Sequence, residues 1–155
     1  MEKIFNQMRL KKFEDKNEWH KISSMSQDYN LFSSPTFFQG LTCPYDLFVI
    51  YDDKKPLLST VVFKKTSLKK KYFLQDFNYN QGIYFLITNK KKQRETLSFL
   101  LDQITKKYNQ LRFSLNYNIQ DIRAFQWHKY PKNEFNFNIM YSSLISISKK
   151  KCIDD

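Results

Sequence analysis

The fold of this chain is decided by a stretch that reads LFVIY at residues 47–51, DDKKP at 52–56 and LLSTVVF at 57–63. The two outer runs are rich in β-branched and aromatic residues, which are enriched in strands. The segment between them is polar and contains a proline, a composition typical of a turn. The sequence therefore predicts a β-hairpin from Leu47 to Phe63.

Two helices are predicted before this hairpin. Asp15 and Glu18 form a capping-box arrangement, and apolar residues follow at helical spacing, so we expect a helix over residues 15–27. Ser34 stands immediately before Pro35, which places a favourable N-cap ahead of a proline at the first helical position. A second, short helix is predicted to begin there and to end by residues 40–44.

A longer helix is predicted after the hairpin, between Asn89 and Tyr108. Apolar residues recur at spacings of three and four within it, so that one face is apolar and the other is charged. The face is formed by Leu97, Leu100, Leu101, Ile104 and Tyr108. Weaker patterns predict further strands at Lys3–Leu10, Lys71–Leu74, Gly82–Ile87, Leu111–Tyr117 and Phe135–Ile147.

These elements predict an α/β fold with a mixed, mostly antiparallel sheet flanked by helices. A chain of 155 residues is long enough for one globular domain, which we place at residues 1–147, followed by a charged tail at 148–155. Cys43 and Cys152 are far apart in sequence, which is not typical of a disulfide framework and indicates a reducing compartment. The first residues are too polar for a signal peptide, and no apolar run approaches the roughly 20 residues that span a bilayer. We therefore expect a cytoplasmic protein with no membrane span.

Glycine occurs only twice, at Gly40 and Gly82. Loops that hold phosphate or a cofactor pyrophosphate need several glycines close together, so the sequence indicates neither a P-loop nor a Rossmann fingerprint. His20 and His128 are the only histidines, and no C-x-x-C or H-x-x-x-H spacing occurs. We accordingly expect no metal site and name no catalytic residue.

The formal net charge is +11. Lys, Asn, Phe, Tyr and Ile are in excess while Gly, Pro and Arg are sparse, a pattern typical of bias toward A- and T-rich codons. The lysines lie in short, dispersed runs, which are usually solvated turns and helix ends. The charge is therefore interpreted first as compositional, and nucleic acid is not the expected partner.

Two stretches combine aromatic residues with amide or guanidinium side chains, namely Tyr72–Gly82 and Asp121–Tyr130. Such side chains together form pockets that stack and hydrogen-bond a polar ligand. The alternative interpretation is that they are core aromatics packed under loops that link strands.

The order of these pieces resembles the N-terminal half of FemAB-like proteins, which belong to the GNAT acyltransferase superfamily. The resemblance covers about residues 1–147. It rests on the order of these elements: the helix with Trp19, the Ser34-Pro35 helix, the hairpin, the stretch before Gly82, the amphipathic helix, the strand after it, Phe125-Gln126-Trp127 and a final strand around Met140-Tyr141. In that family the stretch before the glycine commonly reads Tyr-x-Tyr-Gln-Pro-Phe with two following glutamines; here Gln75, Phe77 and Gln81 match, Asn80 replaces a glutamine and Asp76 replaces the proline.

In that family, acyl-donor binding is generally attributed to the C-terminal half. The resemblance therefore implies a non-donor-binding half that has no cofactor, is not catalytic as an isolated chain, and binds a small polar acceptor. It also implies pairing with a second GNAT-like half or self-association. The residues expected to line the acceptor site are Gln75, Asn80, Gln81, Arg123 and Trp127.

Two other functions stay open at this point. The chain could be a complete small N-acyltransferase that holds acyl-CoA through backbone N–H groups of a splayed strand. It could instead be a basic nucleic-acid-binding module, with phosphates on its cations and bases stacked on exposed aromatic residues.

Overall fold

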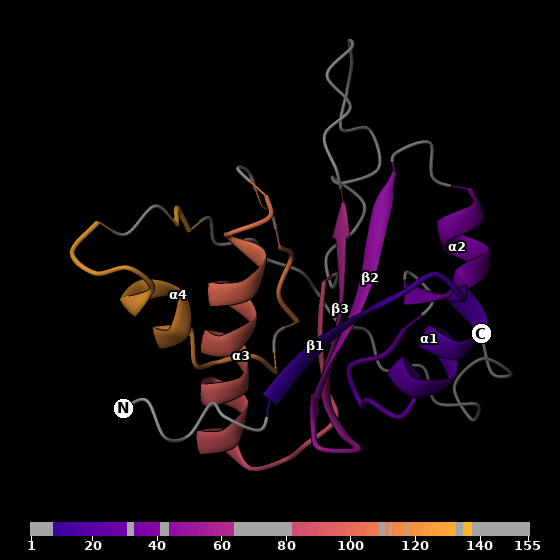
Figure 1. Cartoon of the computed structure of the whole chain (residues 1–155), viewed down its shortest axis with the longest axis horizontal. Coiled ribbons are helices and arrows are strands. Elements are labelled where there is room, and N and C mark those ends of the chain that lie inside the picture. The colour runs from indigo at the N-terminus through magenta and orange to yellow at the C-terminus, as the bar shows by residue number, and fades with distance from the viewer. Residues whose placement is uncertain are drawn as a thin grey trace, which may run out of the picture.

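A four-stranded antiparallel sheet lies between two pairs of helices (Figure 1). The computed structural model describes residues 8–30, 33–40, 44–63, 82–108, 111, 113–116, 118–132 and 135–137. The strands are β1 (Met8–Phe13), β2 (Tyr45–Asp52), β3 (Lys55–Phe63) and β4 (Ile83–Phe85), and they lie side by side in chain order. The helices are α1 (Lys16–Ser23), α2 (Pro35–Gln39), α3 (Lys90–Ile104) and α4 (Arg123–Trp127).

The predicted hairpin is confirmed as β2 and β3, and the turn between them is shorter than the polar segment 52–56. Asp52 pairs with Lys55, so only Asp53 and Lys54 connect the strands. Asp53 has a φ of 52°, a left-handed conformation that aspartate tolerates better than most residues. Pro56 enters β3 beside a register shift, where a residue that cannot donate to the ladder is accommodated.

The two faces of the sheet carry separate hydrophobic clusters. Successive side chains of a strand point to opposite faces. Leu47 and Val49 of β2 pack with Trp19 of α1 and Phe38 of α2, whereas Ile50 belongs to the cluster under α3 and α4. Figure 1 shows α1 and α2 on one side of the strands and α3 and α4 on the other. The sheet is therefore covered on both faces, and this confirms the α/β class.

The helix starts predicted from capping residues are confirmed. The Asp15 carboxylate accepts from the backbone N–H groups of residues 17 and 18, and the Ser34 hydroxyl accepts from Phe37 N at 3.2 Å. However, α1 ends at Ser23 rather than at residue 27. Met25 is 62% exposed, so its helical spacing after Trp19 does not mark a continuing apolar face.

Helix α3 agrees most closely with its prediction. The Asn89 side chain accepts from Lys92 N at 2.9 Å and caps the first turn. The buried face of α3 consists of Thr96, Leu97, Leu100, Leu101 and Ile104, which include all the predicted apolar positions except Tyr108 beyond the end of the helix.

Two strand predictions are wrong where the structure describes the residues. Residues 111 and 113–116 form no strand beyond an isolated bridge at Ser114, and residues 135–137 form none. Two of the alternating apolar side chains still contribute to the core. Phe113 and Phe135 pack against the cluster under α3, although neither residue pairs with a strand of the sheet. Strand β1 also runs on to Phe13, past the predicted end at Leu10. The predicted strand at 71–74, the rest of the last strand and the tail at 148–155 lie outside the described residues.

None of the helices in the described part of the chain has both the length and the apolarity that a bilayer crossing requires.

Candidate ligand-binding groove

A half-open groove of about 520 Å³ lies on the α3 and α4 side of the sheet. Its walls come from parts of the chain that are distant in sequence: the end of β4, the first half of α3, and the segment from residue 118 to residue 126 that includes the start of α4. The lining combines apolar, amide and charged side chains, a mixture typical of sites for small polar ligands. The charged lining residues are Lys90, Arg94, Asp121 and Arg123.

Asp121 and Arg123 form a bidentate ion pair at the wall of the groove. Asp121 Oδ1 accepts from Arg123 Nε at 2.8 Å, and Oδ2 accepts from Nη2 at 2.7 Å. Arg94 Nη1 lies 3.9 Å from the same Oδ2. The hydrogen bonds from Arg123 lower the pKa of the Asp121 carboxyl to about 2, so this carboxylate stays charged at neutral pH.

The groove carries more positive than negative charge. Three cationic residues, Lys90, Arg94 and Arg123, line the groove with one carboxylate, that of Asp121, which pairs with the two arginines. Lys90 and Arg94 are four residues apart on α3, a spacing that places their side chains as neighbours on one helix face. Like charges at that spacing repel, at a cost of about 0.2–0.5 kcal/mol in an isolated helix. An anion held between these two residues removes the repulsion, which makes the groove chemically suited to a ligand with a negative group.

The segment that forms the outer wall is anchored at several points. Asn118 donates from its side-chain nitrogen to Asp28 Oδ1 at 2.8 Å, linking the segment to the loop after α1. The Arg123 backbone N–H donates to Asp121 Oδ1 at 3.1 Å, which fixes the turn into α4. Gln93 donates to the backbone oxygen of Ile87 at 2.7 Å and is thereby oriented along the opposite wall. These bonds hold the polar groups of the groove in place.

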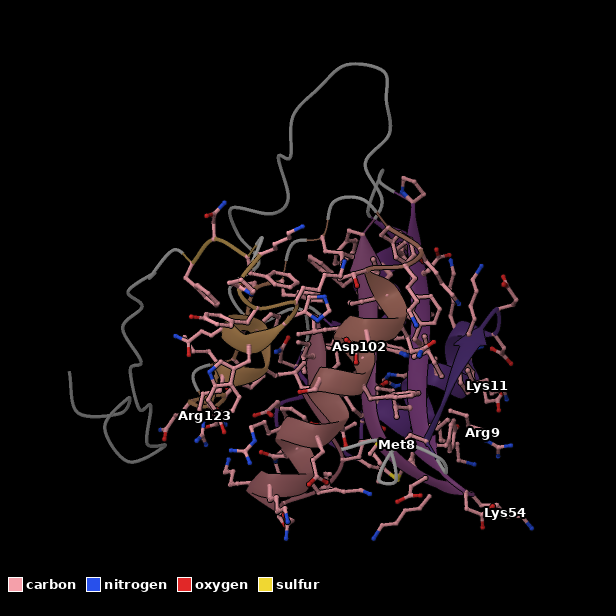
Figure 2. All side chains as sticks on the ribbon, turned by 60° about the vertical axis from the view of Figure 1, so that its left-hand side comes forward. Met8, Arg9, Lys11, Lys54, Asp102 and Arg123 are labelled. Atoms are coloured by element: carbon pink, nitrogen blue, oxygen red, sulfur yellow. The ribbon has the colours of Figure 1, made fainter. Side chains whose placement is uncertain are left out.

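Helix α4 is fixed to α3 by a buried histidine. Thr105 donates its hydroxyl hydrogen to Leu101 O at 2.8 Å, so its oxygen is the acceptor for His128 Nε2 at 3.2 Å. The other ring nitrogen, Nδ1, lies 3.3 Å from Asp102 Oδ1. Both ring nitrogens therefore have a polar partner on α3 or at its end, and these contacts fix the orientation of the ring. Figure 2 shows Asp102 on α3 and Arg123 on the α4 side of the molecule, away from Arg9 and Lys11 of β1.

Of the five residues predicted for the acceptor site, one lines this groove, one does not, and three lie outside the described residues. Arg123 lines it. Trp127, one turn further along α4, is not a lining residue; it is 59% exposed, and the Arg123 guanidinium lies 5.6 Å from its ring centroid. Gln75, Asn80 and Gln81 lie outside the described residues. The stretch that contains Arg123 and Trp127 forms a short helix, α4, which the sequence pattern did not predict.

The other charged residues of the groove were missed from the sequence. Lys90 and Arg94 belong to the polar side of an amphipathic helix, which is ordinarily a solvated face. Nothing in the sequence indicates that this side turns toward Asp121, 27 positions beyond Arg94. Outside the groove, Asp52 at the end of β2 forms an ion pair with Lys92 of α3 at 2.8 Å.

A second polar cluster lies on the opposite face of the sheet. The ring of His20 contacts the Tyr29 hydroxyl through Nδ1, and that hydroxyl lies 3.1 Å from Ser33 O. The Ser33 hydroxyl bonds the buried Tyr84 hydroxyl at 2.7 Å. Burial raises the pKa of Tyr29 to about 12 and also raises that of Tyr84, so both phenols stay protonated. The cluster joins α1 and the loop after it to β4, which is the behaviour of a structural network.

The described residues that line the groove include no serine, cysteine or histidine. In the described parts of the chain, three or more metal-ligating side chains do not gather at any point. Comparison with known proteins finds no match among family models, curated proteins or solved structures. The function of the groove is therefore argued from its own residues.

Proposed function

We propose that this chain is a GNAT-like binding domain that resembles the non-donor-binding half of a FemAB-like N-acyltransferase, and that its groove holds a small polar acceptor. The observation that carries the proposal is the excess of cations around the Asp121 carboxylate. A ligand with a carboxylate or another anionic group pairs with Arg94 and Lys90, while the amide side chains of the groove hydrogen-bond its polar atoms.

The Asp121–Arg123 pair has a defined part in this proposal. Asp121 occupies the Nε and Nη2 edge of the guanidinium, and a guanidinium has further N–H donors on its other edge. Arg123 is thus held in one orientation with donors left for a ligand. An arginine fixed in this way loses less conformational entropy on binding than a free one does.

The architecture supports the GNAT-like part of the proposal. The helix that contains Trp19, the helix that starts at Ser34-Pro35, the hairpin and the amphipathic helix α3 follow one another in the order on which the resemblance rests, whereas the strand expected after α3 is reduced to an isolated bridge at Ser114. Pairing with a second GNAT-like half, or with another copy of the chain, is part of the same proposal.

A complete small N-acyltransferase is the second candidate, and one observation favours it. Lys90 and Arg94 place two cations beside a groove at the beginning of α3, and the phosphates of acyl-CoA are anions of the kind that they attract. The two candidates therefore share the groove and differ in the ligand.

Titration calorimetry with two sets of ligands separates these candidates. One set contains amino acids and amino sugars with and without an anionic group; the other contains acetyl-CoA and coenzyme A. We expect anionic amines to bind, and Arg94→Gln to weaken them by about tenfold or more, as the loss of a charged hydrogen bond predicts. Lys91→Gln is the matched control, because Lys91 is exposed on α3 and does not line the groove.

Three outcomes of this experiment would count against the acceptor proposal. Binding of acetyl-CoA that depends on Arg94 supports the complete enzyme instead of the half. Binding that Lys91→Gln weakens as much as Arg94→Gln reflects the overall charge and contradicts a site in the groove. If neither set binds, the acceptor proposal fails.

A further inference from the structure

Two large aromatic side chains are exposed in the turn at the end of α4. Trp127 is 59% exposed and Tyr130 is 78% exposed. They are three residues apart, and the Tyr130 backbone N–H donates to Trp127 O at 3.2 Å, so they belong to one turn. The other tryptophan, Trp19, is completely buried. Tryptophan and tyrosine are enriched at interfaces, because each combines a large apolar ring with a polar group.

Three cations belong to the same segment of the chain as these two rings. The Arg123 guanidinium lies 5.6 Å from the centroid of the Trp127 ring, within the range of a cation–π interaction. Lys129 and Lys132 are both exposed in the turn that contains Tyr130. Between residues 121 and 132 the sequence has a single carboxylate, that of Asp121, and it is engaged by Arg123. We call Trp127, Tyr130 and these three cations the aromatic platform.

The aromatic platform rests on a rigid base. Ala124 and Phe125 of α4 are buried in the cluster under α3, and His128 is held by Thr105 and Asp102 as described above. Phe135 packs edge-on against both Phe125 and His128, with ring centroids 5.3 Å and 5.7 Å away. The exposed rings are therefore presented by a fixed backbone, which lowers the entropy cost of binding to them.

We propose that the aromatic platform binds single-stranded nucleic acid. Bases stack on Trp127 and Tyr130, and phosphates lie beside Arg123, Lys129 and Lys132. Proteins that bind single strands without sequence preference combine these two features, aromatic faces and a cationic path for the backbone. The net charge of +11 strengthens the attraction at a distance.

The composition of the platform argues against other occupants. A second copy of the chain would bring the same cations face to face, and like charges across an interface oppose association. An acidic peptide satisfies the cations, but it lacks the flat rings that use two neighbouring aromatic faces. The platform is also separate from the acceptor groove, since only Arg123 belongs to both.

Tryptophan fluorescence provides a direct test, because Trp19 is buried and Trp127 is exposed. Oligo(dT) and oligo(U) of about twelve nucleotides are added to the full chain at low salt, with inorganic polyphosphate and poly-glutamate as charged controls. We expect the oligonucleotides to quench the emission of Trp127 and to bind more tightly than polyphosphate does. The affinity should fall as salt is raised, because the phosphate contacts release counterions.

Variants separate stacking from charge attraction. Trp127→Ala should weaken oligonucleotide binding by about five- to hundredfold, the cost of one lost stacking contact, while Trp127→Tyr should restore most of it. Lys54→Gln, in the exposed turn between β2 and β3, removes one charge elsewhere and should have little effect. Circular dichroism checks that each variant is folded.

Three results overturn the proposal. Equal affinity for polyphosphate and oligonucleotide shows charge attraction alone. An oligonucleotide affinity that Trp127→Ala leaves unchanged removes the stacking role. Tighter binding of poly-glutamate that depends on Trp127 assigns the surface to an acidic protein partner instead.

Discussion

Asp121 binds the guanidinium of Arg123 along one whole edge, with oxygen–nitrogen distances of 2.8 Å to Nε and 2.7 Å to Nη2. Arg123 in turn lies against the ring of Trp127. One arginine therefore connects the acceptor groove to the aromatic platform, and Asp121 determines where that arginine lies. Both proposed sites depend on this pair, although they use different ligands.

The Asp121–Arg123 pair should make a pH-dependent contribution to stability. The folded pKa of Asp121, about 2, is below its ordinary value of 3.8, so the contribution is fully present above pH 3.8 and is lost as the pH falls through 2. We expect the Asp121 carboxyl to titrate near pH 2 in a carbon-detected NMR experiment. In Asp121→Asn the stability should depend less on pH between 4 and 2. Titration of Asp121 close to 3.8 would show that the pair does not form in solution.

Gly82 should tolerate substitution much less well than Gly40. Gly82 has a φ of 117°, and a Cβ there would lie 2.9 Å from a ring carbon of Phe113. We expect Gly82→Ala to lower the free energy of unfolding by about 1–3 kcal/mol in urea denaturation, because both backbone strain and a steric clash are introduced. Gly40 has a φ of −76° and its nearest contact is 3.4 Å away, so Gly40→Ala should change stability by less than about 1 kcal/mol. Equal losses in the two variants would contradict this account of Gly82.

Much of the fold could be predicted because its signals are local. Side-chain caps at Asp15 and Ser34 mark two helix starts in the sequence, and each forms its predicted type of hydrogen bond. The start of α4 could not be found in this way, because Ile122 occupies its N-cap position and makes no side-chain capping bond. The alternating apolar residues at 111–117 gave a wrong strand prediction. Leu111, Phe113 and Leu115 are partly buried against the cluster under α3, but they do not form a regular strand.

The groove could be predicted only in part because its walls meet through the tertiary fold. Arg123 was selected for its rarity and its aromatic neighbours, which are visible in the sequence. Arg94 lies on a helix face that resembles any solvated face, and only the packing of α4 against α3 brings it to Asp121. Local sequence patterns do not show which residues of distant segments come into contact in the fold.

The two tryptophans should differ sharply in their effect on stability. Trp19 is fully buried, donates from Nε1 to Phe48 O at 3.1 Å, and contacts the rings of Phe38 and Tyr84. We expect Trp19→Ala to lower the free energy of unfolding by about 3–5 kcal/mol. Trp127→Ala should cost less than about 1 kcal/mol, because it removes only an exposed ring and its contact with Arg123. Denaturant unfolding followed by circular dichroism measures both, and a large loss in Trp127→Ala would mean that this ring has a structural role.

The N-cap of α3 offers a substitution that should raise stability and lower ligand affinity together. Asn89 accepts from Lys92 N at 2.9 Å, and the first turn of α3 has no acidic residue. Asn89→Ala should cost about 1 kcal/mol of unfolding free energy, since the cap is lost. Asn89→Asp keeps the cap and adds a negative charge near the helix start, so it should stabilise by about 0.3–1 kcal/mol at low ionic strength, and less in high salt.

The same aspartate would lie next to Lys90 and reduce the positive charge of the groove. We therefore expect Asn89→Asp to weaken the binding of an anionic acceptor in calorimetry while it raises the denaturation midpoint. A variant that only damaged the fold would lower both quantities, so opposite changes identify an electrostatic effect on the groove. If Asn89→Asp stabilises the chain and leaves anionic ligand affinity unchanged, Lys90 does not contribute to the site and the anion must pair with Arg94 and Arg123 alone.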